Sequence, residues 1–224
     1  IDYTLLDNNA SDIDIISLCK KAILLNVRSI CVMPKHVKIA NKNLVNSSVL
    51  VCSVVSFPDG KNSVEDKISE MKQLLSDGAD EIDVVWNYHQ KENFDYLKQE
   101  LKQLNEIKLK NTTLRGSTPI LKIIVESGLL TNNETKIATE ICIETGVDFI
   151  KTSTGKIAIG AEIEKVKIMR DTISSAPLKI KASGGIRTEE QFQEFLPFVD
   201  RFGIGFASVD QMNGLEGETL SNLY

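Results

Sequence analysis

Histidine is nearly absent from this sequence of 224 residues, which contains only His36 and His89. Neither lies in an HxH or HExxH motif, the spacings at which two imidazoles bind one metal ion. Both stand in loop-like segments, where we expect them to be solvated. The sequence therefore predicts no metal centre.

Long apolar runs and paired cysteines are also missing. No apolar stretch approaches 18 residues, which argues against a transmembrane helix, and the polar Asp2 and Asp7 argue against a secretory signal. The sequence begins at Ile1 rather than Met, so we expect a short leading segment to precede it. No CxxC pair is present, as is typical of reduced, cytoplasmic proteins. The cysteines are Cys19, Cys31, Cys52 and Cys142.

An excess of basic residues is absent too. Lys and Arg number 26 against 31 Asp and Glu, which gives a net charge of −5. A mildly acidic chain without a basic stripe is unlike a protein that mainly binds nucleic acid or an anionic membrane. The 42% hydrophobic and 25% charged residues are instead typical of a globular protein, and the length suits one α/β domain.

Short β-branched runs alternate with longer amphipathic runs along the whole chain. Several runs are apolar at consecutive positions, as in parallel strands that are buried on both faces. The predicted strands are Ile1–Leu6, Ser29–Met33, Val49–Phe57, Glu81–Trp86, Pro119–Glu126, Asp148–Ser153, Leu178–Ser183 and Arg201–Gly205. Helical spacing appears between them, and four helices are predicted to begin with a capping box. The pairs are Ser11 with Asp14, Ser63 with Asp66, Thr131 with Glu134, and Thr188 with Gln191.

This alternation predicts parallel βαβ units in one domain. Eight strands suit a (β/α)₈ TIM barrel over residues 1–224, with 207–224 as the last helix and a polar C-terminal tail. An open, doubly wound sheet has the same local pattern, but the first strands are not followed by the GxGxxG of dinucleotide-binding domains. We therefore predict the barrel.

The segment from Asp148 to Lys156 carries the most chemistry. A lysine inside a buried strand is costly unless it is paired or neutral, and a neutral amine is a nucleophile toward carbonyls. Lys181 lies in the next strand, so Lys151 and Lys181 would be neighbours in a closed barrel and could act as nucleophile and tuning cation. Alternatively, Lys151 reaches water or pairs with Asp148. Lys122 and Lys179 also lie in strands, so position alone does not identify the reactive lysine.

Glycine-containing turns follow three late strands: Thr152–Gly155, Ser183–Arg187 and Gly203–Gly205. Glycine lets backbone amides approach an anion, and barrels often bind phosphate in the loops after strands seven and eight. Lys156 and Arg187 could add charge there. The alternative is that these glycines only form tight turns; three in succession favour a phosphate site.

Two carboxylates and one thiol remain ambiguous. Asp83, among apolar strand residues, is either a satisfied structural acid or a general base, and the same alternatives hold for Asp2. Cys31 lies between apolar neighbours, so packing is its default interpretation.

Seven motifs strongly resemble the deoxyribose-phosphate aldolase family, in the same order along nearly the whole chain. The segments FIKTSTGK and KASGGIRT together are highly specific. The motifs are Ile1–Leu6, Ser29–Pro34, Phe57–Gly60, Gly78–Val85, Leu121–Glu126, Phe149–Lys156 and Lys181–Thr188.

The resemblance implies a class I aldolase on a (β/α)₈ barrel, without metal or organic cofactor. It would reversibly cleave 2-deoxy-D-ribose 5-phosphate to acetaldehyde and D-glyceraldehyde 3-phosphate. Lys151 would form the Schiff base, Lys181 would be the amine that tunes it, and Asp83 would relay protons through water. Substrate-binding positions would be Asp2, Thr4, Cys31, Thr152 and Thr154. Phosphate-binding positions would be Gly155, Lys156, Gly184, Gly185, Ile186, Gly203 and Gly205.

The last strand departs from the family pattern. The family usually has a Ser-Ser pair where this chain has Gly205 and Phe206, and a shifted register would bring in Ser208 instead. A terminal tyrosine assists proton transfer in some members, and Tyr224 is a hypothetical equivalent. We expect a homo-oligomer, most simply a dimer. The alternatives are a Schiff-base lyase for another aldehyde or ketose, and a non-catalytic barrel that binds phosphorylated metabolites.

Overall fold

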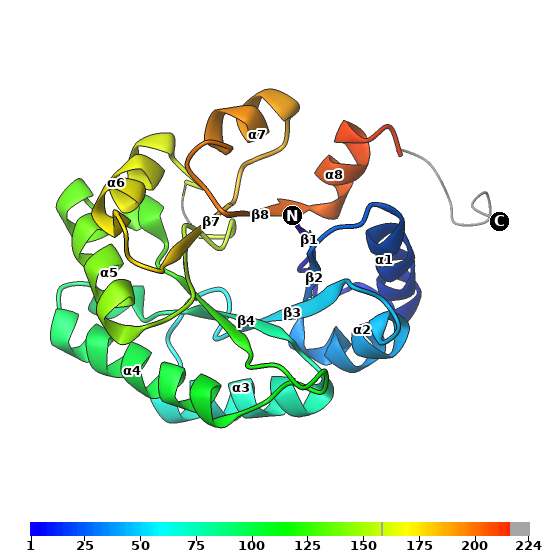
Figure 1. The fold of residues 1–224 in the computed structure, drawn as a ribbon, viewed down its shortest axis with the longest axis horizontal. Coiled ribbons are helices and arrows are strands. Elements are labelled where there is room, and N and C mark those ends of the chain that lie inside the picture. Colours follow the sequence, from blue (N-terminus) through cyan, green and yellow to red (C-terminus); the bar gives the residue numbers. More distant parts are fainter. Residues whose placement is uncertain (158, 216–224) are drawn as a thin grey trace.

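The chain forms a closed barrel of eight parallel strands (Figure 1). A computed structural model describes residues 1–157 and 159–215. Consecutive strands pair in parallel, and β1 pairs with β8 to close the ring. The predicted barrel is thus confirmed over the open sheet. The strands are β1 (Asp2–Leu5), β2 (Ser29–Val32), β3 (Leu50–Val55), β4 (Glu81–Val85), β5 (Ile120–Ile124), β6 (Phe149–Lys151), β7 (Lys179–Ser183) and β8 (Arg201–Gly205).

Eight described helices form an outer ring around these strands, as Figure 1 shows. They are α1 (Asp12–Leu24), α2 (Val37–Leu44), α3 (Val64–Asp77), α4 (Phe94–Lys110), α5 (Asn132–Thr145), α6 (Ile163–Ile173), α7 (Glu189–Phe195) and α8 (Phe206–Met212). Three short 3₁₀ turns are η1 (Pro34–His36), η2 (Tyr88–Gln90) and η3 (Ser127–Leu129). Helix α8 is the last described helix, and residues 216–224 of the predicted tail, with Tyr224, lie outside the described residues. Within the described ranges, the helices are too short or too polar to cross a bilayer.

The predicted capping boxes begin α1, α5 and α7, each with both reciprocal hydrogen bonds. At α3 only half of the box forms: Ser63 accepts from the amide of Asp66, whose carboxylate accepts from the Ser63 hydroxyl. Helix α2 was not among the predicted helices; its N-cap residue, His36, makes no side-chain cap hydrogen bond.

Side chains alternate along the strands, so they form two separate buried regions: one between the strands and the helices, and one inside the barrel. Apolar side chains such as Ile30, Ile123 and Ile150 belong to the main core, with helix residues such as Leu101 and Val166. The other strand positions carry charged groups that contact one another inside the barrel. Strand β6 ends at Lys151, which places that side chain at the carboxyl end of the barrel.

Candidate active site

Three lysines converge on the carboxylate of Asp83. Lys122 Nζ lies 2.8 Å from Oδ1, while Lys151 Nζ and Lys181 Nζ each lie 2.7 Å from Oδ2. The strand register explains this arrangement, because Asp83 is level with Lys122, and Lys151 is level with Lys181. Lys151 therefore pairs with Asp83 and not with Asp148, which binds Lys108.

A second layer of charge lies around this cluster. Asp2 contacts Lys181 Nζ at 2.5 Å and Arg201 at 2.6 Å, and Glu81 contacts Lys122 Nζ at 2.6 Å. Arg201 also contacts Glu81 at 3.2 Å. We call these seven residues the charge network; its members are Asp2, Glu81, Asp83, Lys122, Lys151, Lys181 and Arg201.

The network fixes the charge of most of its members. Burial acts to raise the pKa of Asp83, but the surrounding ammonium groups hold it well below its ordinary value. Burial acts to lower the pKa of Lys122 and Lys181, but their carboxylate partners raise both above the ordinary value. Asp83, Lys122 and Lys181 are therefore ionised at neutral pH.

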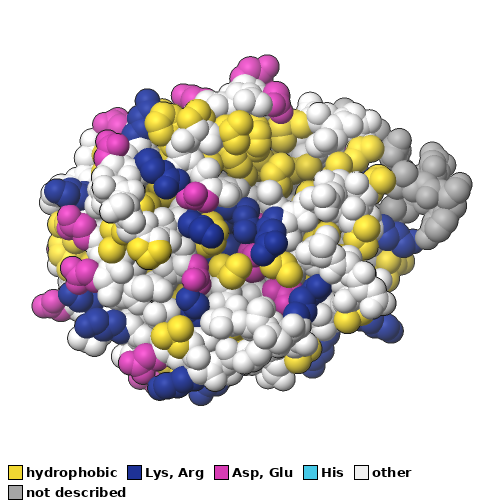
Figure 2. Space-filling view, viewed as in Figure 1, with side chains coloured by type: hydrophobic (Ala, Val, Ile, Leu, Met, Phe, Trp, Pro, Cys, Tyr) yellow, Lys and Arg dark blue, Asp and Glu magenta, His cyan; other side chains and the backbone are white. Residues whose placement is uncertain are grey.

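Lys151 differs from the other two lysines in its access to substrate. It lines a cavity of about 390 Å³, whereas the side chains of Lys122 and Lys181 are 0% exposed and are not among the described residues that line it. In Figure 2, Lys and Arg side chains gather at the centre of the face seen down the barrel. Lys151 is thus the member of the trio that a substrate in this cavity could reach.

The same cavity brings together all the positions predicted to bind phosphate. Gly155, Gly184 and Gly185 have φ values of +73°, +85° and +81°, a conformation that favours glycine. Thr4, Thr154 and Ser208 also line the cavity. The phosphate positions in its wall are Gly155, Lys156, Gly184, Gly185, Ile186, Gly203 and Gly205.

Three other predicted substrate-binding residues lie outside that lining. Asp2 is fully buried in the charge network, and Thr152 is buried with its hydroxyl donating to the carbonyl of Ser183. Cys31 is also fully buried. A hydrogen bond with the Cys52 thiol lowers the pKa of Cys31, whereas burial raises that of Cys52.

The two thiols and Asp83 are close enough to hold a metal ion, since their ligand atoms lie within 4.8 Å of one another. However, the Asp83 carboxylate already faces three lysine ammonium groups, and Lys122 Nζ lies 3.3 Å from Cys52 Sγ. A further cation would meet this positive charge, so the donor set suits the lysines better than a metal.

Sequence reasoning missed three groups inside the barrel: Glu81, Arg201 and Cys52. The signal for Glu81 was its spacing of two residues from Asp83, which puts both carboxylates on the same face of β4. Arg201 lies at the start of a strand, where an arginine also suits the solvent-exposed rim. Its partners, Asp2 and Glu81, are remote in sequence.

The prediction that both histidines are solvated is wrong for His36. Its side chain is buried, because η1 folds directly after β2, and its Nε2 atom has no hydrogen-bond partner among the described residues. Burial lowers the pKa of His36, so the ring is neutral at pH 7. His89 is exposed, as predicted.

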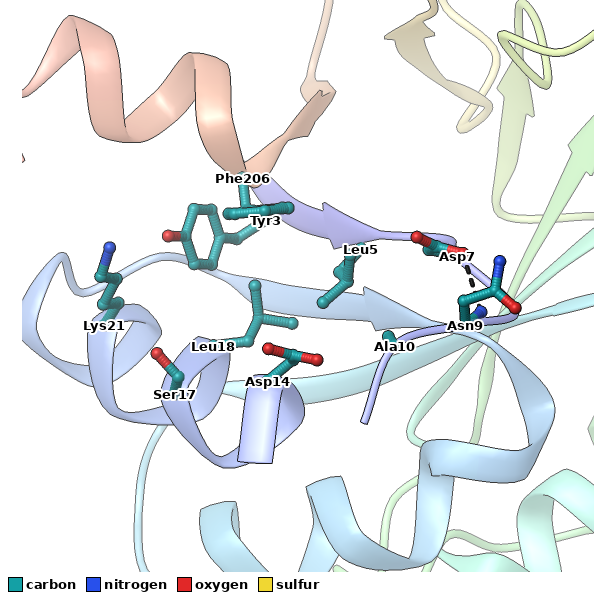
Figure 3. Close-up of a pocket in the computed structure, with 10 residues that line it drawn as sticks. All are labelled: Tyr3, Leu5, Asp7, Asn9, Ala10, Asp14, Ser17, Leu18, Lys21 and Phe206. Atoms are coloured by element: carbon teal, nitrogen blue, oxygen red, sulfur yellow. Dashed lines mark hydrogen bonds between the residues drawn. The ribbon is translucent and has the colours of Figure 1, made fainter. Parts of the chain in front are cut away.

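A second cavity, of about 320 Å³, lies between β1, α1 and the start of α8 (Figure 3). Figure 3 shows Tyr3 and Phe206 close together, and their rings meet edge to face with centroids 6.4 Å apart. Leu5, Asp7 and Phe206 line both cavities. The Phe206 ring therefore lies between the two cavities.

Comparisons with known proteins place the chain in a family. Residues 1–206 match the family model for DeoC/LacD family aldolases. The chain is 42% identical over 198 residues to a deoxyribose-phosphate aldolase from Mycoplasmoides pirum, covering 87% of this chain and 86% of that one. It is 40% identical over 193 residues to the corresponding protein from Finegoldia magna, covering 85% and 86%.

Solved structures agree with this relationship. An aldolase called QR15 has a TM-score of 0.84 and 35% identity, covering 93% of this chain and 90% of its own. A tetrameric deoxyribose phosphate aldolase from Aeropyrum pernix has a TM-score of 0.83 at 23% identity, covering 96% and 89%, which shows the shared fold. As its motifs predicted, this chain belongs to the DeoC/LacD family of aldolases.

Proposed function

We propose that this chain is a deoxyribose-phosphate aldolase. It would reversibly cleave 2-deoxy-D-ribose 5-phosphate to acetaldehyde and D-glyceraldehyde 3-phosphate through a Schiff base on Lys151. The observation that carries this proposal is the position of Lys151, which contacts Asp83, the counter-ion that it shares with Lys181, and faces a cavity walled by glycine turns. The 40–42% identity to curated relatives of that name supports the substrate.

Charge balance favours Lys151 as the nucleophile. The network holds four cationic side chains and three carboxylates, so full ionisation leaves one positive charge in excess. Lys122 and Lys181 remain charged, as their raised pKa values indicate, and Arg201 does not lose its proton. Since Lys122, Lys181 and Arg201 already balance the three carboxylates, Lys151 is the amine of the network that is left to attack a carbonyl.

The reaction follows from this arrangement. The Lys151 amine adds to the substrate aldehyde, and the resulting carbinolamine loses water to give a protonated imine. The bond between the second and third carbons then breaks, its electron pair flows into the imine to form an enamine, and the third-carbon hydroxyl loses its proton. The Asp83 carboxylate stabilises the cationic imine, and we assign it the proton relay through water that the family resemblance implies.

The glycine turns would hold the phosphate at the far end of the substrate. Backbone amides at Gly155, Gly184 and Gly185 can approach an anion closely, and Lys156 adds a positive charge to the wall. Binding a remote phosphate orients the bond to be broken against Lys151. We also propose that Thr4 and Thr154 contact the sugar chain.

Borohydride trapping with acetaldehyde tests the nucleophile. We expect mass spectrometry to find a two-carbon adduct on Lys151, with none on Lys122 or Lys181 because the cavity does not reach them. Lys122→Met is the matched control, since it removes a neighbouring buried lysine and should still be trapped at Lys151. An adduct on another lysine, or none, would falsify the assignment.

The phosphate site is tested by comparing kcat/KM for deoxyribose 5-phosphate with that for deoxyribose. We expect a preference of at least tenfold, which corresponds to about 1.4 kcal/mol. A smaller ratio would favour the second candidate, a Schiff-base lyase for an unphosphorylated aldehyde. The observation in its favour is the Phe206 ring beside the phosphate positions.

We further propose that the protein acts in the cytoplasm as a homodimer. The described cysteines are all buried free thiols, as suits a reducing compartment. Exposed apolar side chains such as Ile13 (77%) and Ile159 (69%) provide surface for self-association. Sedimentation analysis should give a mass of twice the chain; a monomer or a tetramer would contradict the dimer.

A further inference from the structure

Glu126 is a buried acid at the end of β5 to which the proposed chemistry gives no role. Its side chain is 0% exposed, and its backbone adopts the left-handed conformation at φ +50° and ψ +59°. A non-glycine residue in this region is strained, and burying a carboxylate costs free energy unless it is well paired. Both features together point to a specific task for this residue.

The carboxylate of Glu126 accepts one hydrogen bond among the described residues. Its Oε2 accepts a hydrogen bond from the backbone amide of Thr154 at 3.1 Å, and its Oε1 has no partner. Thr154 continues into the turn whose Gly155 and Lys156 line the substrate cavity with Lys151. The Thr154 hydroxyl in turn accepts from the amide of Lys156 at 3.1 Å.

This segment after β6 is also fixed from the opposite side. The Ser183 hydroxyl donates to the carbonyl of Ser153 at 2.6 Å, and Thr152 exchanges two hydrogen bonds with the backbone of Ser183. On the β5 side, the amide of Ser127 donates to the carbonyl of Thr152 at 2.8 Å. Glu126 holds the next residue of this segment, Thr154, where the glycine turn begins.

We propose that Glu126 is a positioning residue that sets the phosphate-binding turn 154–156 relative to Lys151. The inference rests on the proposed function. Glu126 does not reach the reacting atoms; it fixes the amide of Thr154, and through it the amides that follow. Loss of this anchor should weaken recognition of the phosphate end of the substrate and leave Schiff-base formation on Lys151 intact.

Two substitutions separate the anchor from the buried charge. Glu126→Gln keeps the length and an oxygen that accepts from Thr154, whereas Glu126→Leu removes the acceptor and leaves an apolar side chain. A buried carboxylate with an unpaired oxygen can often be replaced by an apolar group without loss of stability, so the leucine variant should fold. We expect Glu126→Leu to lose at least tenfold in kcat/KM for deoxyribose 5-phosphate, mainly through KM.

Two measurements distinguish positioning of the turn from a general role in stability: the preference for the phosphorylated substrate, and hydrogen exchange at the amides of the turn. Activity on unphosphorylated deoxyribose and trapping of acetaldehyde on Lys151 should stay within about twofold in Glu126→Leu. Hydrogen exchange at Thr154 and Gly155 should accelerate in that variant and stay slow in Glu126→Gln, which should also keep the phosphate preference.

Glu70→Leu is the matched control. Glu70 lies on α3, and its carboxylate likewise accepts from a backbone amide, that of Ser56, at 2.8 Å. Ser56 lies in the loop after β3, outside the phosphate cavity. The Glu70→Leu variant should keep the wild-type phosphate preference. The inference is overturned if the wild type prefers the phosphorylated substrate and Glu126→Leu loses kcat/KM equally on deoxyribose 5-phosphate and deoxyribose. It is also overturned if Glu126→Gln shows the same loss as Glu126→Leu. A wild type without phosphate preference overturns the proposed phosphate site and this inference with it.

Discussion

Asp83 shows how one residue can organise the chemistry of a whole barrel. Its two oxygens contact three ammonium groups that come from three successive strands. Because two of those groups remain charged, the carboxylate remains anionic and can stabilise positive charge on the third, Lys151. A neutral side chain of the same shape cannot do this.

At the scale of this residue, we predict that Asp83→Asn lowers kcat by about 100-fold or more, because the imine loses its counter-charge and the relay loses its base. The measurement is steady-state turnover of deoxyribose 5-phosphate. Glu81→Gln is the matched control: Glu81 is equally buried on the same strand but contacts Lys122 and Arg201 instead of Lys151. Similar losses in both variants would mean that Asp83 serves stability alone.

The helices illustrate how local sequence fixes where an element begins. Helix α5 has a complete capping box, in which Thr131 accepts from the amide of Glu134 and Glu134 accepts from that of Thr131. Those hydrogen bonds lower the pKa of Glu134. Helix α3 has the hydroxyl cap without the return bond, because the Asp66 carboxylate binds the Ser63 hydroxyl instead.

At the scale of these elements, we predict that Glu134→Ala, which removes the return bond to the Thr131 amide, costs about 1 kcal/mol of unfolding free energy, and Asp66→Ala, which removes none, about half of that. Urea denaturation at pH 7 measures both. The part of the unfolding free energy that comes from ionised Glu134 is present above its unfolded pKa near 4.5. It is lost as the pH falls through the lower pKa of the folded state. A larger cost in Asp66→Ala than in Glu134→Ala would contradict the role given to the return bond.

The charge network ties the whole molecule together, since it joins β1 to β8 as well as β4 to β7. Asp2 bridges Lys181 and Arg201 with both of its oxygens. Burial acts to raise the pKa of Asp2, but these cations and Lys122 lower it far below its ordinary value. The ionised form is therefore part of the folded state.

At the scale of the molecule, we predict that Asp2→Asn destabilises the protein by about 3 kcal/mol at pH 7, because it leaves buried cations unpaired. A depressed carboxyl pKa contributes stability above the unfolded value near 3.8, and this stability is lost as the pH falls toward the folded pKa. The difference between variant and wild type should thus shrink below pH 3.8 in urea titrations. A constant difference from pH 7 to pH 3 would refute the ionic origin.

The sequence predicts the barrel well, because each strand and most helices carry a local signal: consecutive β-branched residues, or a hydroxyl followed three residues later by an acid or amide. It also predicts Lys151, Lys181 and the glycine turns as neighbours, since parallel strands place their carboxyl ends at one edge. The burial of His36 depends on a turn without such a signal. The partners of Arg201 and the anchor at Glu126 depend on contacts between residues that are remote in sequence, which local patterns do not encode.

The order of charges along the chain has a consequence for assembly. Every acid of the charge network comes from β1 or β4, and every base comes from β5, β6, β7 or β8. Each half of the polypeptide thus contributes charges of one sign to the network, and their partners within the network come from the other half. Half-barrels cut between α4 and β5 should be unable to fold separately, yet should attract each other and reconstitute the enzyme when they refold together.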